Sequence, residues 1–291
     1  MVRYPVSLVP SRTLSILAAV LIRAAVLSLA LAGVTNLAAD AVDDWQNLVM
    51  AALRAASAGE FASSEQLFLR AVQQTERFSP GDARVGTTLN SLGLVYKEEK
   101  KFPDAERAFE KALGILEKAY GPDSLDVGNI DFNIASVLML EDRWDSALPY
   151  IQKSRAVYKK MLGPDSLKVA SSLCLEGDAY RNLKKYSEAE APLKECANER
   201  EAAGGMQNPE LADALYSLGL VYSQVGKYAL ADQTLKLTAK IREITAGVTS
   251  PLFAEALEAH AAVLRMMGRG QDAVKDDAMA AAVRRNEKKK Q

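Results

Sequence analysis

The segment Phe102–Leu125, FPDAERAFEKALGILEKAYGPDSL, decides the fold, because its pattern returns 42 residues later as Trp144–Leu167, WDSALPYIQKSRAVYKKMLGPDSL. Both segments begin with an aromatic residue and end in the same five residues, Gly-Pro-Asp-Ser-Leu. Aromatic residues continue this series in both directions, at a spacing of 41 or 42 residues: Phe61, Phe102, Trp144, Tyr186 and Tyr228. A fixed period of this length indicates a chain built from one repeated supersecondary unit.

Within each copy, the positions after the aromatic residue follow the period of a helix. A small residue stands three positions later and an apolar residue seven positions later, a spacing that places them on one helix face. The small residues are Ser64, Ala105, Ala147, Ala189, Ala231 and Ala273, and the apolar residues are Phe68, Phe109, Ile151, Leu193 and Leu235. One buried face of a helix is thereby predicted in each copy.

A second helix is predicted before each aromatic residue, and it carries a small residue at one repeated position. These residues are Ala52, Gly93, Ala135, Gly177, Gly219 and Ala261. A glycine costs a helix about 1 kcal/mol, so we expect close packing of the two helices to offset that cost. The Gly-Pro-Asp-Ser linkers, at residues 121–124 and 163–166, supply helix stops and amino-terminal caps.

A helix-turn-helix unit with this order of small, aromatic and apolar positions resembles the tetratricopeptide repeat. The 42-residue period, the Gly-Pro-Asp linker and segments such as Thr88–Tyr96, TLNSLGLVY, resemble the kinesin-light-chain type of that repeat. The resemblance covers residues 45 to 283 and implies an all-α fold, a right-handed α-solenoid of about six helix-turn-helix repeats. It is specific for the fold and weak for function, because such repeats serve many partners.

The sixth copy departs from the pattern in a way that predicts a terminal cap. Gly270 replaces the aromatic residue and Asp277 replaces the apolar residue. Because a solenoid needs a polar end for solubility, we expect this copy to close the array.

Residues 1–41 have the features of a secretory signal peptide: basic residues, apolar stretches and then small residues suited to cleavage. The alternative is an uncleaved membrane anchor over residues 14–34. Arg23 argues against that anchor, because an arginine at the centre of a span costs about 2.5–3.5 kcal/mol on insertion scales. We therefore predict an exported protein, periplasmic or secreted, with a repeat domain at 42–283 and a basic tail at 284–291.

The sequence offers little for catalysis, metal binding or nucleic-acid binding. It has 36 basic and 37 acidic residues, so it lacks the positive field that grips a phosphate backbone. None of the nucleotide-binding, serine-hydrolase or zinc-peptidase motifs is present, and we predict neither enzyme activity nor a cofactor. The single histidine, His260, falls at an inward position, where we expect it to be packed and hydrogen-bonded. Cys174 and Cys196 could form a bridge between two helices, although small unbridged buried residues are the favoured interpretation.

In the resembled repeats the first helices line a concave groove that receives a protein or peptide. Transferring this register gives a candidate set of partner-binding residues: Asn90, Leu94, Phe132, Met139, Asp178, Arg181, Tyr216 and Leu220. We expect the four large apolar residues to be exposed, since exposed apolar side chains mark contact surfaces. The alternative is that they pack against neighbouring copies. As a hypothesis, Phe132 and Tyr216 anchor a peptide that Asn90 and Arg181 orient.

The leading functional interpretation is a non-catalytic scaffold that binds a protein or peptide of unknown identity in this groove. The alternative is a membrane-tethered assembly factor or an accessory subunit of an envelope enzyme complex. Retention of residues 14–34 would favour the tethered factor, and a polar pocket with a perturbed carboxylate would favour a role in enzyme chemistry.

Overall fold

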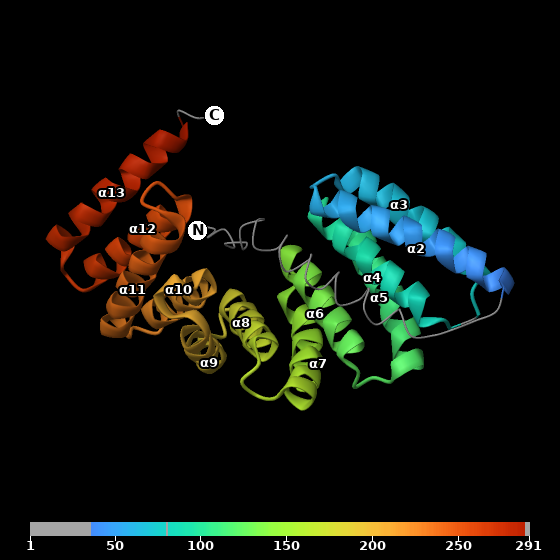
Figure 1. Cartoon of the computed structure of the whole chain (residues 1–291). Helices are drawn as coiled ribbons and strands as arrows, with labels where there is room; N and C mark the ends of the chain where they lie inside the picture. Colours follow the sequence, from blue (N-terminus) through green and yellow to red (C-terminus); the bar gives the residue numbers. More distant parts are fainter. Residues whose placement is uncertain (1–35, 80, 289–291) are drawn as a thin grey trace. The chain divides into compact units, whose positions relative to one another are not determined.

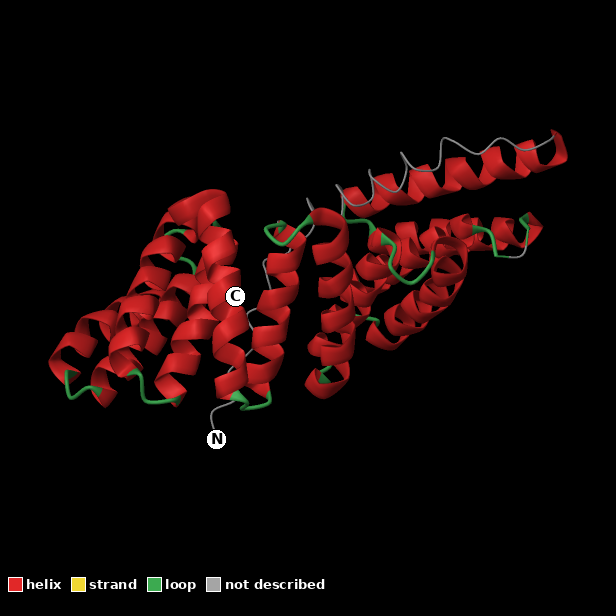
Figure 2. Cartoon of the chain, turned by 90° about the horizontal axis from the view of Figure 1, so that it is seen from below, coloured by secondary structure: helices red, strands yellow, loops and turns green. Residues whose placement is uncertain are grey.

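A computed structural model describes residues 36–79 and 81–288, and every regular element in that part of the chain is helical (Figure 1; Figure 2). The expected signal peptide or anchor lies outside the described residues, apart from its last turns, which belong to the first helix. No helix of the described residues is both long and apolar enough to cross a membrane. The chain divides into an amino-terminal unit, which ends at Met161, and a carboxyl-terminal unit, which begins at Leu162.

The amino-terminal unit consists of three helix pairs. Their helices are α2 (Asn36–Ser57) with α3 (Phe61–Gln74), α4 (Ala83–Glu98) with α5 (Phe102–Tyr120), and α6 (Leu125–Leu140) with α7 (Trp144–Leu162), and a short 3₁₀ turn, η2 (Thr75–Arg77), follows α3.

The carboxyl-terminal unit has the same organisation. It contains α8 (Leu167–Asn182) with α9 (Tyr186–Gly204), α10 (Pro209–Gln224) with α11 (Tyr228–Ala246), and α12 (Pro251–Met266) with α13 (Gly270–Lys288), and the 3₁₀ turn η3 (Gly205–Gln207) follows α9. The prediction of an all-α chain of six repeated helix pairs is therefore confirmed for the described residues.

The predicted helix boundaries are confirmed at the Gly-Pro-Asp-Ser linkers. Gly121 and Gly163 end their helices with φ values of 83° and 90°, a left-handed conformation that favours glycine. Ser124 and Ser166 then accept hydrogen bonds from the amides of Val127 and Val169, which cap α6 and α8. One linker sequence thus stops one helix and starts the next.

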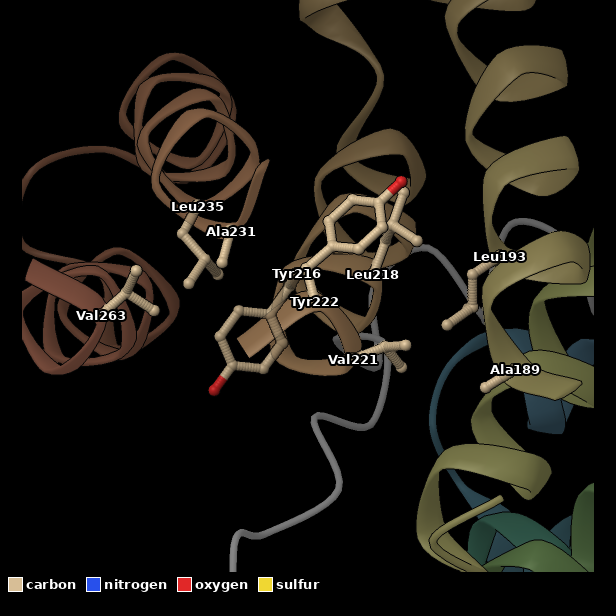
Figure 3. Packing of buried hydrophobic residues seen from close by; sticks show 9 residues of the cluster. All are labelled: Ala189, Leu193, Tyr216, Leu218, Val221, Tyr222, Ala231, Leu235 and Val263. Atoms are coloured by element: carbon tan, nitrogen blue, oxygen red, sulfur yellow. The ribbon is translucent and has the colours of Figure 1, made fainter. Parts of the chain in front are cut away.

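The predicted close approach within each pair is also confirmed. A Cβ atom placed on Gly177 would lie 2.4 Å from Cγ of Leu193, and one placed on Gly219 would lie 2.6 Å from Cγ of Leu235. Both leucines belong to a buried cluster that joins α9, α10, α11 and α12 (Figure 3). The small residues of the first helices are therefore the sites where the second helices insert their apolar side chains.

The last helix extends beyond the expected domain boundary. Because α13 runs to Lys288, Arg284 and Arg285 are helical residues and not part of a separate tail. Asp277, which replaces the usual apolar residue, forms an ion pair with Arg265 of α12.

Candidate partner-binding site

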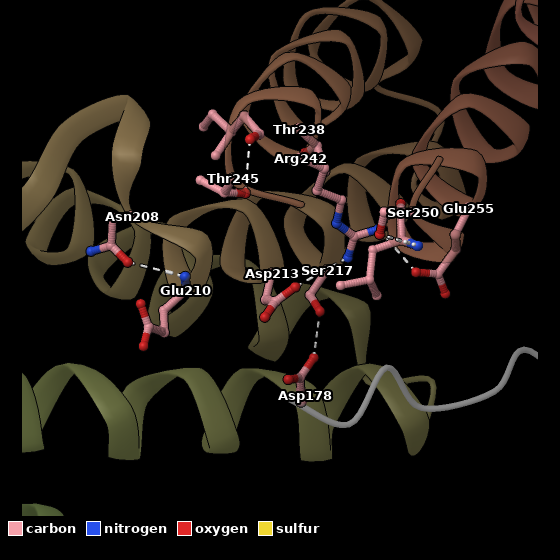
Figure 4. Close-up of polar contacts among 12 residues, drawn as sticks. Asp178, Asn208, Glu210, Asp213, Ser217, Thr238, Arg242, Thr245, Ser250 and Glu255 are labelled. Atoms are coloured by element: carbon pink, nitrogen blue, oxygen red, sulfur yellow. Dashed lines mark hydrogen bonds and ion pairs between the residues drawn. The ribbon is translucent and has the colours of Figure 1, made fainter. Parts of the chain in front are cut away.

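In the carboxyl-terminal unit, the outward side of the first helices carries a connected set of polar side chains, which we call the first-helix face. Asp178 on α8 accepts hydrogen bonds from Arg181 Nε, at 3.3 Å, and from the hydroxyl of Ser217 on α10, at 2.6 Å (Figure 4). The second bond ties two successive first helices together. Asp178, Arg181 and Leu220 are all half-buried, so each still presents atoms to solvent.

The neighbouring side chains are organised by Arg242, which the sequence analysis did not identify. Its guanidinium donates to Asp213 Oδ1 on α10 at 3.1 Å, and to Glu255 Oε2 and the Leu252 carbonyl oxygen on α12, both at 2.9 Å. The Arg242 side chain is only 2% exposed. Charged hydrogen bonds of this kind, inside a buried site, hold three helices in fixed positions.

Tyr216 corrects one expectation: it is buried and not an exposed anchor. Its exposed fraction is 5%, and the Arg242 guanidinium lies 4.5 Å from its ring centroid, a cation–π contact. Burial raises the pKa of the Tyr216 hydroxyl. Burial also raises the pKa of the Asp213 carboxyl, although Arg242 opposes that shift. The ring is thus covered by a side chain from α11 that the periodic pattern of the first helices does not reveal.

Met139 was also expected to be exposed, and this too is wrong, because only 7% of its surface is accessible. It lies on α6, which packs against both α4 and α5. Its neighbours Val137 and Leu138 are likewise buried, so α6 is covered on several sides.

The other candidates of the amino-terminal unit keep partial exposure. Asn90 on α4 accepts a hydrogen bond at 3.0 Å from the side-chain amide of Asn133 on α6. Phe132 and Leu94 are half-buried, and the ring centroid of Phe132 lies 6.3 Å from that of Tyr158 on α7. Asn90 therefore connects two first helices, much as Asp178 does in the other unit.

A polar contact recurs between the two helices of successive pairs. Its donors stand 42 residues apart and each lies 29 residues after its acceptor: Tyr158 with Asn129, Arg200 with Ser171, and Arg242 with Asp213. The period of the second helices could have revealed these donors, but a rule based on apolar and small residues passes over them.

His260 confirms its expected role as a packed, hydrogen-bonded residue. Its Nδ1 lies 2.6 Å from Asp276 on α13, and its Nε2 lies 2.7 Å from Asp232 on α11. The ring thus connects three helices. Burial opposes ionisation of Asp232, but His260 and Arg269 outweigh it and lower the pKa of that carboxyl.

The two cysteines correct the favoured interpretation of the sequence. Cys174 on α8 and Cys196 on α9 form a disulfide, with Cα atoms 5.4 Å apart, inside the usual range for such a bridge. The described residues contain no cluster of three or more side chains suited to hold a metal ion. The first-helix face can thus offer hydrogen bonds, charge and apolar contact to a ligand.

Comparisons with known proteins agree with the geometry. Two sequence models described as Tetratricopeptide repeat match the chain, one at residues 45–125 and 126–202 and the other at residues 212–243. No curated protein matches the sequence.

Among solved structures, BtubC (BKLC) from P. vanneervenii is 19% identical, with a TM-score of 0.63 over 81% of this chain and 91% of that one. A putative kinesin light chain from Podosopora anserina is 16% identical, with a TM-score of 0.62 over 72% and 99%. PilW, described as a type IV pilus biogenesis factor, is 18% identical, with a TM-score of 0.61 over 82% and 92%. At these identities the likeness shows the fold.

Proposed function

The chain belongs to the tetratricopeptide repeat family, and from that premise we propose that it is a non-catalytic scaffold that binds a segment of a partner protein on its first helices. The hydrogen-bonded array of Asp178, Ser217, Asp213 and Arg242 carries this proposal. Such an array keeps the side chains around it in fixed positions before a ligand arrives, and pre-organisation lowers the entropy cost of binding.

The residues that meet the partner are those that stay partly exposed. In the carboxyl-terminal unit they are Asp178, Arg181 and Leu220, and in the amino-terminal unit Asn90, Leu94 and Phe132 serve the same purpose. Tyr216 and Met139 contribute packing beneath the surface. The binding surface combines both charges with apolar side chains, which suits an extended peptide or protein segment in a groove.

Site-specific photo-crosslinking in the native cell tests this proposal. A photoreactive phenylalanine analogue at Leu220 should form an adduct with a partner, because Leu220 lies on the first-helix face. The same analogue at Lys194, which is exposed on the second helix α9, is the matched control. Mass spectrometry of the adducts identifies the partner. Equal adducts at both positions, or adducts only at Lys194, would place the binding surface elsewhere.

We also propose that the protein is exported, with residues 1–41 as its leader. The Cys174–Cys196 disulfide supports this location, since disulfides persist in oxidising compartments. The second candidate function is a membrane-tethered assembly factor, and the resemblance in fold to the pilus biogenesis factor PilW favours it. Mass spectrometry of the purified protein separates the two: an amino terminus near Asp40 or Val42 supports the exported scaffold, and one at Met1 supports the tethered factor.

A further inference from the structure

In the carboxyl-terminal unit, the junction between α11 and α12 shows how one helix pair receives the next. Ala239 on α11 is buried in a cluster with Phe253 and Leu257 of α12. Arg242, one turn further along α11, donates a hydrogen bond to the carbonyl oxygen of Leu252, at the start of α12. The face of α11 that carries Ala239 and Arg242 is therefore covered by a first helix.

The last helix presents the equivalent face, and no helix follows it within the described residues. Ala281 and Arg284 stand 42 residues after Ala239 and Arg242, and Ala281 is exposed where Ala239 is buried. The guanidinium of Arg284 forms a two-pronged ion pair with Glu258, the residue equivalent to Tyr216 beneath Arg242. A groove of about 430 Å³ lies here, lined by Glu258, Asp277, Ala280, Ala281, Arg284 and Arg285.

At the other end of the array, α2 is a first helix whose outward side is acidic at its start. Ala52 and Ala261 occupy the same repeat position, which places Asp43 and Asp44 where α12 carries Leu252 and Phe253. Both aspartates are exposed. The acidic start of α2 thus matches the part of α12 that lies beside Arg242, and Arg242 corresponds to Arg284 on the last helix.

A second complementary pair lies further along the same two helices. Arg54 of α2, which is exposed, occupies the position of Val263 in α12. Val263 packs in one buried cluster with Leu235 of α11 (Figure 3). The residue equivalent to Leu235 in the last pair is Asp277, so a first helix seated on α13 with the sequence of α2 would bring Arg54 towards a carboxylate.

We propose that two copies of this chain associate head to tail, with α2 of one copy seated on α12 and α13 of the next as α12 is seated on α11. Asp43 and Asp44 then face Arg284 and Arg285, and Arg54 faces Asp277. The formal net charge of the chain is only −1, so little long-range repulsion opposes the contact. Because such an interface leaves one end of each copy available, the assembly is an open chain.

Sedimentation velocity over a concentration series tests the proposal on the purified protein. The average mass should rise with concentration and fall as salt is added, since exposed charge pairs are screened. The variant Arg284→Glu/Arg285→Glu and the variant Asp43→Lys/Asp44→Lys should each remain monomeric. An equimolar mixture of the two variants should associate again, because each then meets a partner of opposite charge.

The control is Lys111→Glu/Lys118→Glu, which changes the net charge equally on the exposed surface of α5. It should associate as the unmodified protein does, and it should gain nothing from mixing with the Asp43→Lys/Asp44→Lys variant beyond its own association. Circular dichroism verifies that each variant folds. A monomeric unmodified protein throughout the series, or a mixture of the two end variants that stays monomeric, overturns the proposal.

Discussion

Asp131 is the side chain that departs most from its repeat position. Leucine stands at the same position in four other copies, as Leu89, Leu173, Leu215 and Leu257. Asp131 is buried in α6, and among the described residues its Oδ1 atom has no hydrogen-bond partner. Burial raises the pKa of this carboxyl to about 6, with a smaller opposing effect from Lys153. A buried, unpaired carboxylate destabilises the folded state when it is ionised.

The Asp131→Asn variant should therefore be more stable than the unmodified protein at pH 8. The folded state holds the Asp131 proton more tightly than the unfolded chain, so stability falls as the pH rises from about 4 to about 6 and then levels off. The full difference is about 3 kcal/mol, at 1.36 kcal/mol for each unit of pKa. Thermal unfolding at pH 4 and pH 8 measures it.

The control for Asp131 is Glu110→Gln, which removes an exposed carboxylate from α5 and should leave the pH dependence unchanged. A gain from Asp131→Asn of the same size at both pH values would contradict the assigned cause.

The helix pair is held together by contacts at its small residues. In the pair α4–α5, a Cβ atom on Gly93 would lie 2.6 Å from Cε1 of Phe109, whereas one on Gly114 would meet nothing within 4 Å. The sequence pattern predicted the first contact, since Gly93 and Phe109 both belong to repeated positions. It could not rank the copies, because Ala135 and Ala261 occupy the same position as Gly93 without a glycine.

Gly93→Ala should lower the free energy of unfolding by about 1–3 kcal/mol, because an extra methyl group in a tightly packed contact forces side chains or backbone to move. Gly114→Ala, in the same helix pair, should be neutral or stabilising by up to about 1 kcal/mol, from helix propensity alone. Urea unfolding of both variants gives the comparison. Equal effects would show that the contact with Phe109 does not limit the size of the residue at position 93.

Contacts between neighbouring helix pairs stabilise the whole chain, as in other repeat proteins. The disulfide Cys174–Cys196 and the ring of His260 both connect elements that are adjacent in the array. Removing one such contact should therefore have local consequences, because each pair touches only its neighbours.

His260→Ala should accelerate amide hydrogen exchange in α13 and leave exchange in α2 and α3 unchanged. The substitution leaves the carboxylates of Asp232 and Asp276 without the ring that connects them, and an unsatisfied buried partner costs about 1–3 kcal/mol. Hydrogen exchange followed by mass spectrometry reports each helix separately. A uniform increase over all helices would mean that the chain unfolds as one cooperative unit.

The repeated helix pairs, their boundaries and their tight contacts follow from residues close together in the chain or one period apart, and so a periodic pattern was enough to predict them. The cover over Tyr216, the burial of Met139, the bridge between Cys174 and Cys196 and the roles of Arg242 and Asp131 were settled by folding. Each depends on which side chain of a neighbouring helix reaches the residue, and a hydrophobic period carries no information about that reach. The candidate binding residues were therefore placed on the correct helices, while their exposure had to come from the packed molecule.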